Sequence, residues 1–184
     1  MSIGEIKMRQ TSKSVSPMSN EGRNAYVIKH LTEAFLSLLA KKSIEDISIS
    51  ELVDTAGVGR ASFYRNYESK EDILKSHLDT LFHEWTDEWE KKDAAPLSEQ
   101  VRTMISHFEK HRSFYQLLNE RGLIYLLKDV IIGICGPKPE YEKTQAYATA
   151  FVAYTLYGWI DIWFQRGMVE SADEIAELFK VQGL

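Results

Sequence analysis

The sequence lacks the features that would direct a protein out of the cytoplasm or into a membrane. It contains one cysteine, Cys135, in 184 residues, so no disulfide can form within the chain, which suits a reducing compartment. The longest apolar run, residues 130–135, is far shorter than the roughly 20 residues of a membrane-spanning helix. No basic segment followed by an apolar stretch opens the chain. These absences predict a cytoplasmic protein without membrane contact.

Signatures of catalysis and of metal binding are also missing. The chain has neither a Gly-Xaa-Ser-Xaa-Gly nucleophile motif nor a phosphate-binding loop, and Cys135 has no neighbouring basic residue to lower its pKa. His107 and His111 are four residues apart on a predicted helix, but no Cys or acidic partner completes the three or four ligands that zinc takes. We therefore expect neither an enzyme nor a metalloprotein, and no cofactor.

Positive charge is scarce, and its distribution is uneven. The net charge is −5, which by itself argues against a nucleic-acid partner. Residues 1–75 carry 11 Lys and Arg against 10 Asp and Glu, whereas residues 76–184 carry 11 against 17. The excess of acid therefore belongs to the C-terminal part, and the N-terminal part stays compatible with a polyanionic partner.

Helical periodicity is the pattern that the chain does show. Apolar residues make up 44% of it and charged residues 27%, as in soluble globular domains. No segment has the alternation of a strand, and no internal repeat is visible. We predict an all-α fold of about nine helices, divided into a flexible arm (residues 1–21), a three-helix head (22–68) and a helical body (69–184).

Residues 48–70 predict two short helices joined by a tight turn. Ser48 and Glu51 form a capping-box pattern that starts the first helix, and Gly57 ends it, because glycine adopts a left-handed backbone without steric cost. A second helix from residue 59 or 60 to residue 66 then buries Phe63 and Tyr67. Its outer face keeps polar and small residues, namely Arg60, Ala61, Ser62, Tyr64, Arg65 and Asn66. This is a helix-turn-helix pattern, although an ordinary α-hairpin has similar local signals.

A long helix is predicted from Ser69 to about Trp89, with Ser69 and Asp72 as its capping pair. Lys70 in its first turn lies next to the helix-turn-helix, whereas Trp85 lies 15 residues further on, about 22 Å away at 1.5 Å per residue. We expect this helix to be a rigid rod that carries a signal between head and body.

The remaining helices are predicted from apolar spacing and caps. An amphipathic helix over residues 26–40 supports the helix-turn-helix from beneath. After the rod, helices are expected near residues 97–110, 114–119, 123–134 and 140–166, and a last helix begins at the Ser171 and Glu174 capping pair.

Three segments carry a specific family resemblance: Ala-Gly-Val at 56–58, Ser-Phe-Tyr-Arg-Asn-Tyr at 62–67 and Ser-Lys-Glu-Asp-Ile-Leu at 69–74. Together they resemble the DNA-binding signature of the TetR family of one-component transcriptional regulators, over residues 24–81. Beyond residue 81 only length and helical pattern are similar. The resemblance implies a homodimer that binds a double-stranded DNA operator and an effector in its C-terminal domain.

The resemblance also implies DNA-binding roles for single residues. The base-reading positions correspond to Arg60, Ala61 and Ser62. Phosphate contacts and helper positions correspond to Ser48, Ser50, Tyr64, Asn66 and Lys70, with Arg65 on the same face. The chemistry suits these roles, because arginine pairs with guanine and hydroxyl or ammonium groups bind phosphate oxygens. Gly59 departs from the Ser or Thr often found at this helix start, which removes a side-chain cap.

The body is rich in aromatic residues, and the resemblance implies that some of them line an effector pocket. The candidates are Phe82, Trp85, Phe108, Tyr115, Tyr125, Tyr147, Phe151 and Tyr154. Such a pocket would favour a small apolar or aromatic effector. An aromatic stripe at helical spacing is equally the pattern of an ordinary core, which stays the alternative.

The last two long helices are the predicted dimer interface, through Gly158, Trp159, Ile162, Leu178 and Phe179. The overall prediction is a homodimeric DNA-binding repressor that reads a palindrome and is released by its effector. Two alternatives stay open. One is a helical adaptor that binds only protein, which the acidic body favours, and the other is a regulator without a small-molecule effector.

Overall fold

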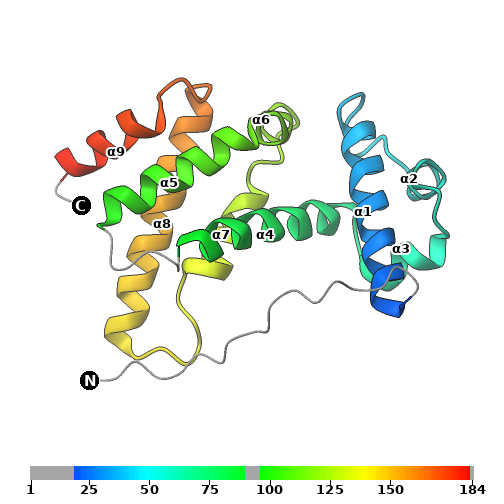
Figure 1. Ribbon diagram of the computed structural model, residues 1–184, viewed down its shortest axis with the longest axis horizontal. Coiled ribbons are helices and arrows are strands. Elements are labelled where there is room, and N and C mark those ends of the chain that lie inside the picture. Colours follow the sequence, from blue (N-terminus) through cyan, green and yellow to red (C-terminus); the bar gives the residue numbers. More distant parts are fainter. Residues whose placement is uncertain (1–18, 90–95, 183–184) are drawn as a thin grey trace.

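Nine helices and no strand make up the described part of the chain, residues 19–89 and 96–182 of this computed structural model (Figure 1). The predictions of an all-α fold and of about nine helices are confirmed. In chain order the helices are α1 (Asn20–Leu39), α2 (Ile49–Ala56), α3 (Arg60–Asn66), α4 (Lys70–Trp89), α5 (Leu97–Lys110), α6 (Arg112–Glu120), α7 (Leu126–Cys135), α8 (Lys143–Gln165) and α9 (Ala172–Val181). None of them is long and apolar enough to cross a membrane.

Helices α1, α2 and α3 form the head and share one buried cluster. Leu31 and Phe35 of α1, Leu52 of α2 and Phe63 of α3 are all fully buried in it. Helices as short as α2 and α3 are marginal by themselves in water, and each large apolar side chain that is buried contributes about 1.5–3 kcal/mol. Packing on α1 therefore holds both short helices in place.

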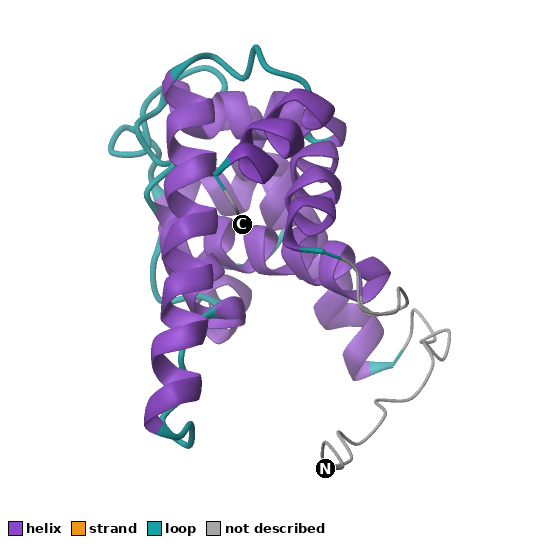
Figure 2. Ribbon diagram, turned by 90° about the vertical axis from the view of Figure 1, so that its left-hand side faces the viewer, coloured by secondary structure: helices purple, strands orange, loops and turns teal. Residues whose placement is uncertain are grey.

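Helix α4 connects the head to the body formed by α5 to α9 (Figure 1). It packs against α1 on the head side and against α5 and α7 on the body side, while α9 lies along α5 and α8 packs on α7. Figure 2 shows that loops are confined to the ends of these helices. Since α4 spans Lys70–Trp89, the predicted continuous helix between head and body is confirmed.

Helix α1 begins earlier than predicted. Ser19 caps it by accepting a hydrogen bond from the amide of Gly22 at 2.9 Å, and the helix is continuous from Asn20. The predicted arm is therefore wrong for residues 20 and 21, and residues 1–18 lie outside the described part of the chain. Tyr26 is exposed, and contact of α1 with the core starts at the partly buried Val27, so the apolar spacing does not mark where the helix begins.

Two of the three predicted capping pairs are reciprocal in the structure. Ser171 and Glu174 form both bonds of a capping box, and Ser69 and Asp72 do the same at 3.2 and 2.8 Å. At α2 only the Ser48 hydroxyl acts, accepting from the Glu51 amide at 3.1 Å. The Glu51 carboxylate instead forms an ion pair with Lys42, because the loop after α1 brings that ammonium group within 2.6 Å.

Candidate nucleic-acid interface

The turn between α2 and α3 has the left-handed geometry that the sequence predicts. Gly57 has a φ of 65° and a ψ of 32°, and its amide donates to the carbonyl oxygens of the last turn of α2. The amide of Val58 then donates to the Val53 carbonyl oxygen at 3.0 Å. These bonds satisfy carbonyl groups that a helix end otherwise leaves unpaired, and they set the angle at which α3 leaves the turn.

Helix α3 presents a polar face to solvent. Arg60, Ala61, Tyr64 and Arg65 are exposed, whereas Phe63 between them is fully buried and anchors the helix. Gly59 precedes the helix without a side-chain cap, as predicted. An exposed helix of this kind, carried by a second helix, can enter the major groove of DNA.

Arg60 and Tyr64 of this face are in contact with each other. One guanidinium nitrogen of Arg60 donates to the Tyr64 hydroxyl at 3.3 Å, and the guanidinium carbon lies 5.7 Å from the centre of the ring. Stacking on the ring restricts the rotamers of a long side chain, so less entropy is lost when the guanidinium binds a partner. The Arg60 side chain is therefore partly ordered before it binds any partner.

Lys70 is placed differently from the exposed residues of α3. Its ammonium group is partly buried and donates to the carbonyl oxygen of Ile47 at 2.7 Å and to that of Ile44. An ammonium group has three N–H donors, so one stays available for a phosphate. Lys70 anchors α4 to the loop between α1 and α2, and its contact with DNA stays a prediction, as do those of the exposed Ser48 and Ser50.

A polar hollow between α1 and α3 extends this surface and was missed from the sequence. Its volume is about 630 Å³, and it is lined by Asn20, Arg23, Asn24, Val27, Ser62, Arg65 and Asn66. Arg23 was not expected on a helix, because the apolar stripe of the first predicted helix starts only at Tyr26. The Ser19 cap was the signal that would have placed Arg23 in the first turn of α1. Two guanidinium groups thus lie on either side of one hollow.

The eight aromatic residues proposed as an effector pocket fall into two groups. Phe82, Trp85, Phe108 and Tyr115 are buried at 2% exposure or less. Tyr125, Tyr147, Phe151 and Tyr154 are each more than half exposed. The structure therefore does not bring the eight together into one cavity. The buried group forms the aromatic core between α4, α5 and α6, in which neighbouring ring centroids are 4.5 to 6.1 Å apart.

Polar atoms are buried beside this aromatic core. Among the described residues, the Tyr115 hydroxyl and the Nε2 atoms of His107 and His111 have no hydrogen-bond partner. Burial raises the pKa of Tyr115, and burial with the nearby charges of His111 and Lys110 lowers the pKa of His107 to about 4. Both groups are neutral near pH 7, and each can hydrogen-bond a ligand that enters between the helices.

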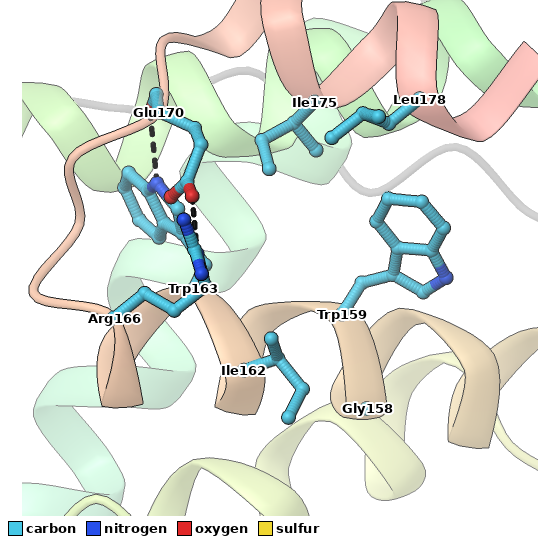
Figure 3. A pocket seen from close by; sticks show the side chains of 8 residues that line it. All are labelled: Gly158, Trp159, Ile162, Trp163, Arg166, Glu170, Ile175 and Leu178. Atoms are coloured by element: carbon cyan, nitrogen blue, oxygen red, sulfur yellow. Dashed lines mark hydrogen bonds and ion pairs between the residues drawn. The ribbon is translucent and has the colours of Figure 1, made fainter.

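An apolar groove between α8 and α9 contains most of the predicted dimer residues (Figure 3). Gly158, Trp159, Ile162 and Leu178 line it, with a volume of about 330 Å³, and Ile162 and Leu178 are about half exposed. Phe179 instead points inward, is fully buried and packs on the Trp159 ring at 4.9 Å. At one end of the groove the side chains of Arg166 and Glu170 form an ion pair.

Cys135 is partly buried and packs against the hydrophobic core, so the predicted core position is only partly met. Burial raises the pKa of its thiol, so little of the reactive thiolate forms at neutral pH. The described residues contain no group of three or more His, Cys, Asp or Glu side chains that could hold a metal ion.

Comparison with known proteins places the head in a family. Residues 31–76 match the model of the bacterial regulatory proteins of the tetR family. Over 106 residues the chain is 31% identical to the uncharacterized HTH-type transcriptional regulator YxbF of Bacillus subtilis (strain 168). That match covers 53% of this chain and 28% of YxbF, so the chain aligns with little more than a quarter of its relative.

Solved structures show how far the fold extends. Lin0861 from Listeria innocua superimposes with a TM-score of 0.67 at 14% identity, over 91% of this chain and 94% of that one. A TetR transcriptional regulator from Streptococcus agalactiae 2603V superimposes with a TM-score of 0.58 at 17% identity, over 91% and 98%. At these identities the likeness concerns the fold, and it includes the body as well as the head. The helix-turn-helix part of the chain, over residues 31–76, is therefore that of the tetR family of bacterial regulatory proteins.

Proposed function

We propose that this chain is a cytoplasmic transcriptional repressor that binds a palindromic operator as a homodimer and leaves it when a small apolar or aromatic effector binds the body. The observation that carries the proposal is the exposed polar face of α3, with Arg60 stacked on Tyr64 and the Arg23 and Arg65 hollow beside it. Both features involve α3, along which a duplex would dock.

The roles within this surface follow from chemistry. Arg60 at the start of α3 suits guanine, Ala61 suits a thymine methyl group, and Ser62 accepts or donates to a base edge. Arg23 and Arg65 suit the phosphates on either side of the groove, since guanidinium groups bind phosphate oxygens with two N–H donors. Only a few cations are involved, so binding should be moderate in affinity and sensitive to salt.

Pairing of two chains would use the groove between α8 and α9. Its exposed apolar side chains, Ile162 and Leu178, are suited to burial against a second copy, and Gly158 permits close approach because no atom lies within 4 Å of a Cβ built on it. Two α8 helices and two α9 helices would form a four-helix bundle. Recognition helices about one helical turn apart, roughly 34 Å, would then read two half-sites.

The effector would bind where polar atoms are buried in the aromatic core. A ligand that separates α4 from α5 and α6 would contact Phe82 and Phe108, and it could hydrogen-bond the Tyr115 hydroxyl and His107. We therefore propose a flat apolar effector with at least one hydrogen-bonding group. Since α4 also carries Lys70, which holds the head, displacement of α4 would change the position of α3.

Selection of DNA by the full chain from a random-sequence pool tests the proposal. We expect a palindrome with two half-sites about one turn apart, bound by a species that sediments as a dimer. Enrichment of no sequence would overturn the DNA-binding role and favour a protein adaptor. Release of the selected duplex is then measured with a panel of aromatic acids, and sugar phosphates serve as the control panel. If no compound in either panel releases the duplex, the regulator acts without an effector of this class.

A further inference from the structure

A single arginine joins the body to the head at a point away from α4. Arg121 follows directly after α6, and its Nε atom donates to the Leu39 carbonyl oxygen at 2.7 Å, while a terminal nitrogen donates to the Ala40 carbonyl oxygen at 2.9 Å. Leu39 is the last residue of α1, and Ala40 is its C-cap. The contact therefore spans 82 residues of sequence and places a cation at the C-terminal end of the supporting helix of the head.

The chemistry of this contact makes it stronger than an average surface interaction. The last carbonyl groups of a helix have no partner within the helix, and they carry the negative end of its dipole. A guanidinium group presents several N–H donors in a fixed plane, so it can hold two carbonyl oxygens in one orientation. Because the bond to Leu39 is partly buried, water screens it less than it would on an open surface.

The other end of α6 is held in the same way. Arg112, the first residue of α6, donates to the Met168 carbonyl oxygen at 2.7 Å, in the turn between α8 and α9. That turn is tightly constrained, since Gly167 and Met168 both have positive φ angles, of 81° and 57°. Helix α6 is thus fixed at one end to the α8–α9 turn and at the other to the end of α1, and Figure 1 shows it between them.

A second attachment point restricts how the head can move relative to the body. A connection through one helix alone leaves the head free to tilt or turn about α4. Lys70, on α4, donates hydrogen bonds to the loop after α1. Arg121, at the end of α6, donates hydrogen bonds to the C-terminal end of α1. Two separate attachments fix the orientation of the head relative to the body, and thereby the orientation of α3.

We infer that Arg121 is a positioning residue that sets the angle of the DNA-binding head relative to the body. Tyr115 and Phe114 lie within α6, and Phe114 packs on His77 of α4 with the ring centroids 4.7 Å apart. A ligand that separates α6 from α4 would therefore act on Arg121 as well. This inference rests on the proposed reading of a palindrome by two heads.

The test compares a full operator with a half-site. The probes are a palindrome selected by the full-length wild-type protein and the same duplex with one arm scrambled. Arg121→Ala should weaken binding to the palindrome at least tenfold and change binding to the half-site less than twofold, because each head remains folded but the spacing between the two is lost. Arg121→Lys keeps the charge but cannot bind two carbonyl oxygens in one plane. Its affinity for the palindrome should lie between those of Arg121→Ala and wild type.

Arg102→Ala is the matched control. Arg102 lies on α5 and pairs with Glu99 and Asp173, all within the body, so its removal should leave both affinities unchanged. Equal weakening of palindrome and half-site by Arg121→Ala would mean that Arg121 only supports the fold of the head, which overturns the inference. Unchanged affinity for the palindrome would overturn it as well.

A measurement without DNA separates this inference from the proposed function. Nitroxide labels at Thr55→Cys on α2 and Gln116→Cys on α6, both exposed positions, report the distance between head and body in a Cys135→Ser background diluted with unlabelled protein. Arg121→Ala should broaden the distance distribution, whether or not the chain binds an operator. A distribution identical to that of the labelled chain with Arg121 intact would overturn the inference even if DNA binding is confirmed.

Discussion

The ring of Tyr115 packs edge-on against Phe108, with 4.5 Å between the ring centroids and an angle of 71°, and its hydroxyl has no hydrogen-bond partner among the described residues. A fully buried hydroxyl without a partner costs about 1–3 kcal/mol. Tyr115 thus combines a strong apolar contact with an unfavourable polar one, which is the combination expected where a ligand group can enter.

Replacement of this tyrosine tests the cost of its unpaired hydroxyl and the proposed role of that hydroxyl in ligand binding. Tyr115→Phe keeps the ring and removes the hydroxyl, so the free energy of unfolding without ligand should rise by about 1 kcal/mol. Urea titration followed by circular dichroism measures the change. The same variant should bind any effector found in the release assay more weakly. A less stable Tyr115→Phe protein would show that the hydroxyl already has a favourable partner.

His107 should make the stability of the protein dependent on pH. Burial lowers its folded pKa to about 4 from an ordinary value of 6.5, so below pH 6.5 the unfolded chain binds the proton more readily than the folded one. The free energy of unfolding should therefore fall as the pH drops from about 6.5 to about 4. His107→Gln should flatten this slope in denaturant titrations at several pH values.

Gly57 is required for its backbone conformation and not for space. No atom lies within 4 Å of a Cβ built on it, but its φ is 65°. Gly57→Ala should therefore destabilise the protein by about 1–2 kcal/mol. Gly133→Ala is the control, because Gly133 lies within α7 in equally open space, and alanine there should stabilise the helix by up to about 1 kcal/mol. The unfolding temperatures of both variants give the comparison. Equal changes in unfolding temperature would contradict a requirement for the left-handed conformation at Gly57.

Introduction of a charge into the α8–α9 groove should prevent the proposed pairing of two chains. Ile162 is 53% exposed on α8, and Ile162→Glu would bury a carboxylate at the proposed interface, which is costly without a counter-charge. Sedimentation velocity at micromolar concentration should show a monomer for this variant. Tyr26→Glu, at a position 56% exposed on the head, should remain a dimer. A wild-type monomer would refute the proposed pairing directly.

Arg60 and Lys70 should differ in what their removal does to DNA recognition. Arg60→Ala should weaken the free energy of operator binding by about 1–3 kcal/mol and relax the sequence preference at one base position. Lys70→Ala should weaken all sequences alike, and it should also lower the unfolding temperature, because Lys70 donates to Ile44 and Ile47 in the folded head. Binding to a set of single-base operator variants separates the two effects. Identical profiles would mean that α3 is oriented differently in the groove.

Several features that depend on near neighbours in sequence were predicted correctly. The helix over residues 70–89, the left-handed Gly57 and the uncapped start at Gly59 all follow from local rules of steric fit and hydrogen bonding. These rules act over about four residues, so the pattern of residue types is enough. The start of α1 was misplaced because apolar spacing records burial, whereas the Ser19 cap marks the actual beginning of the helix.

Contacts between distant segments were decided only by the tertiary structure. Phe82 and Phe151 both lie at regular helical spacing, but the packing of α4 against α5 buries the first, and Phe151 on α8 remains 57% exposed. The bonds from Arg121 to α1 cross 82 residues, and no local pattern predicts them, because an arginine after a helix has many available partners. The sequence by itself determined where the chain is helical and where it turns, since those choices are local, whereas the tertiary structure decided which aromatic residues are buried and which cations join the head to the body.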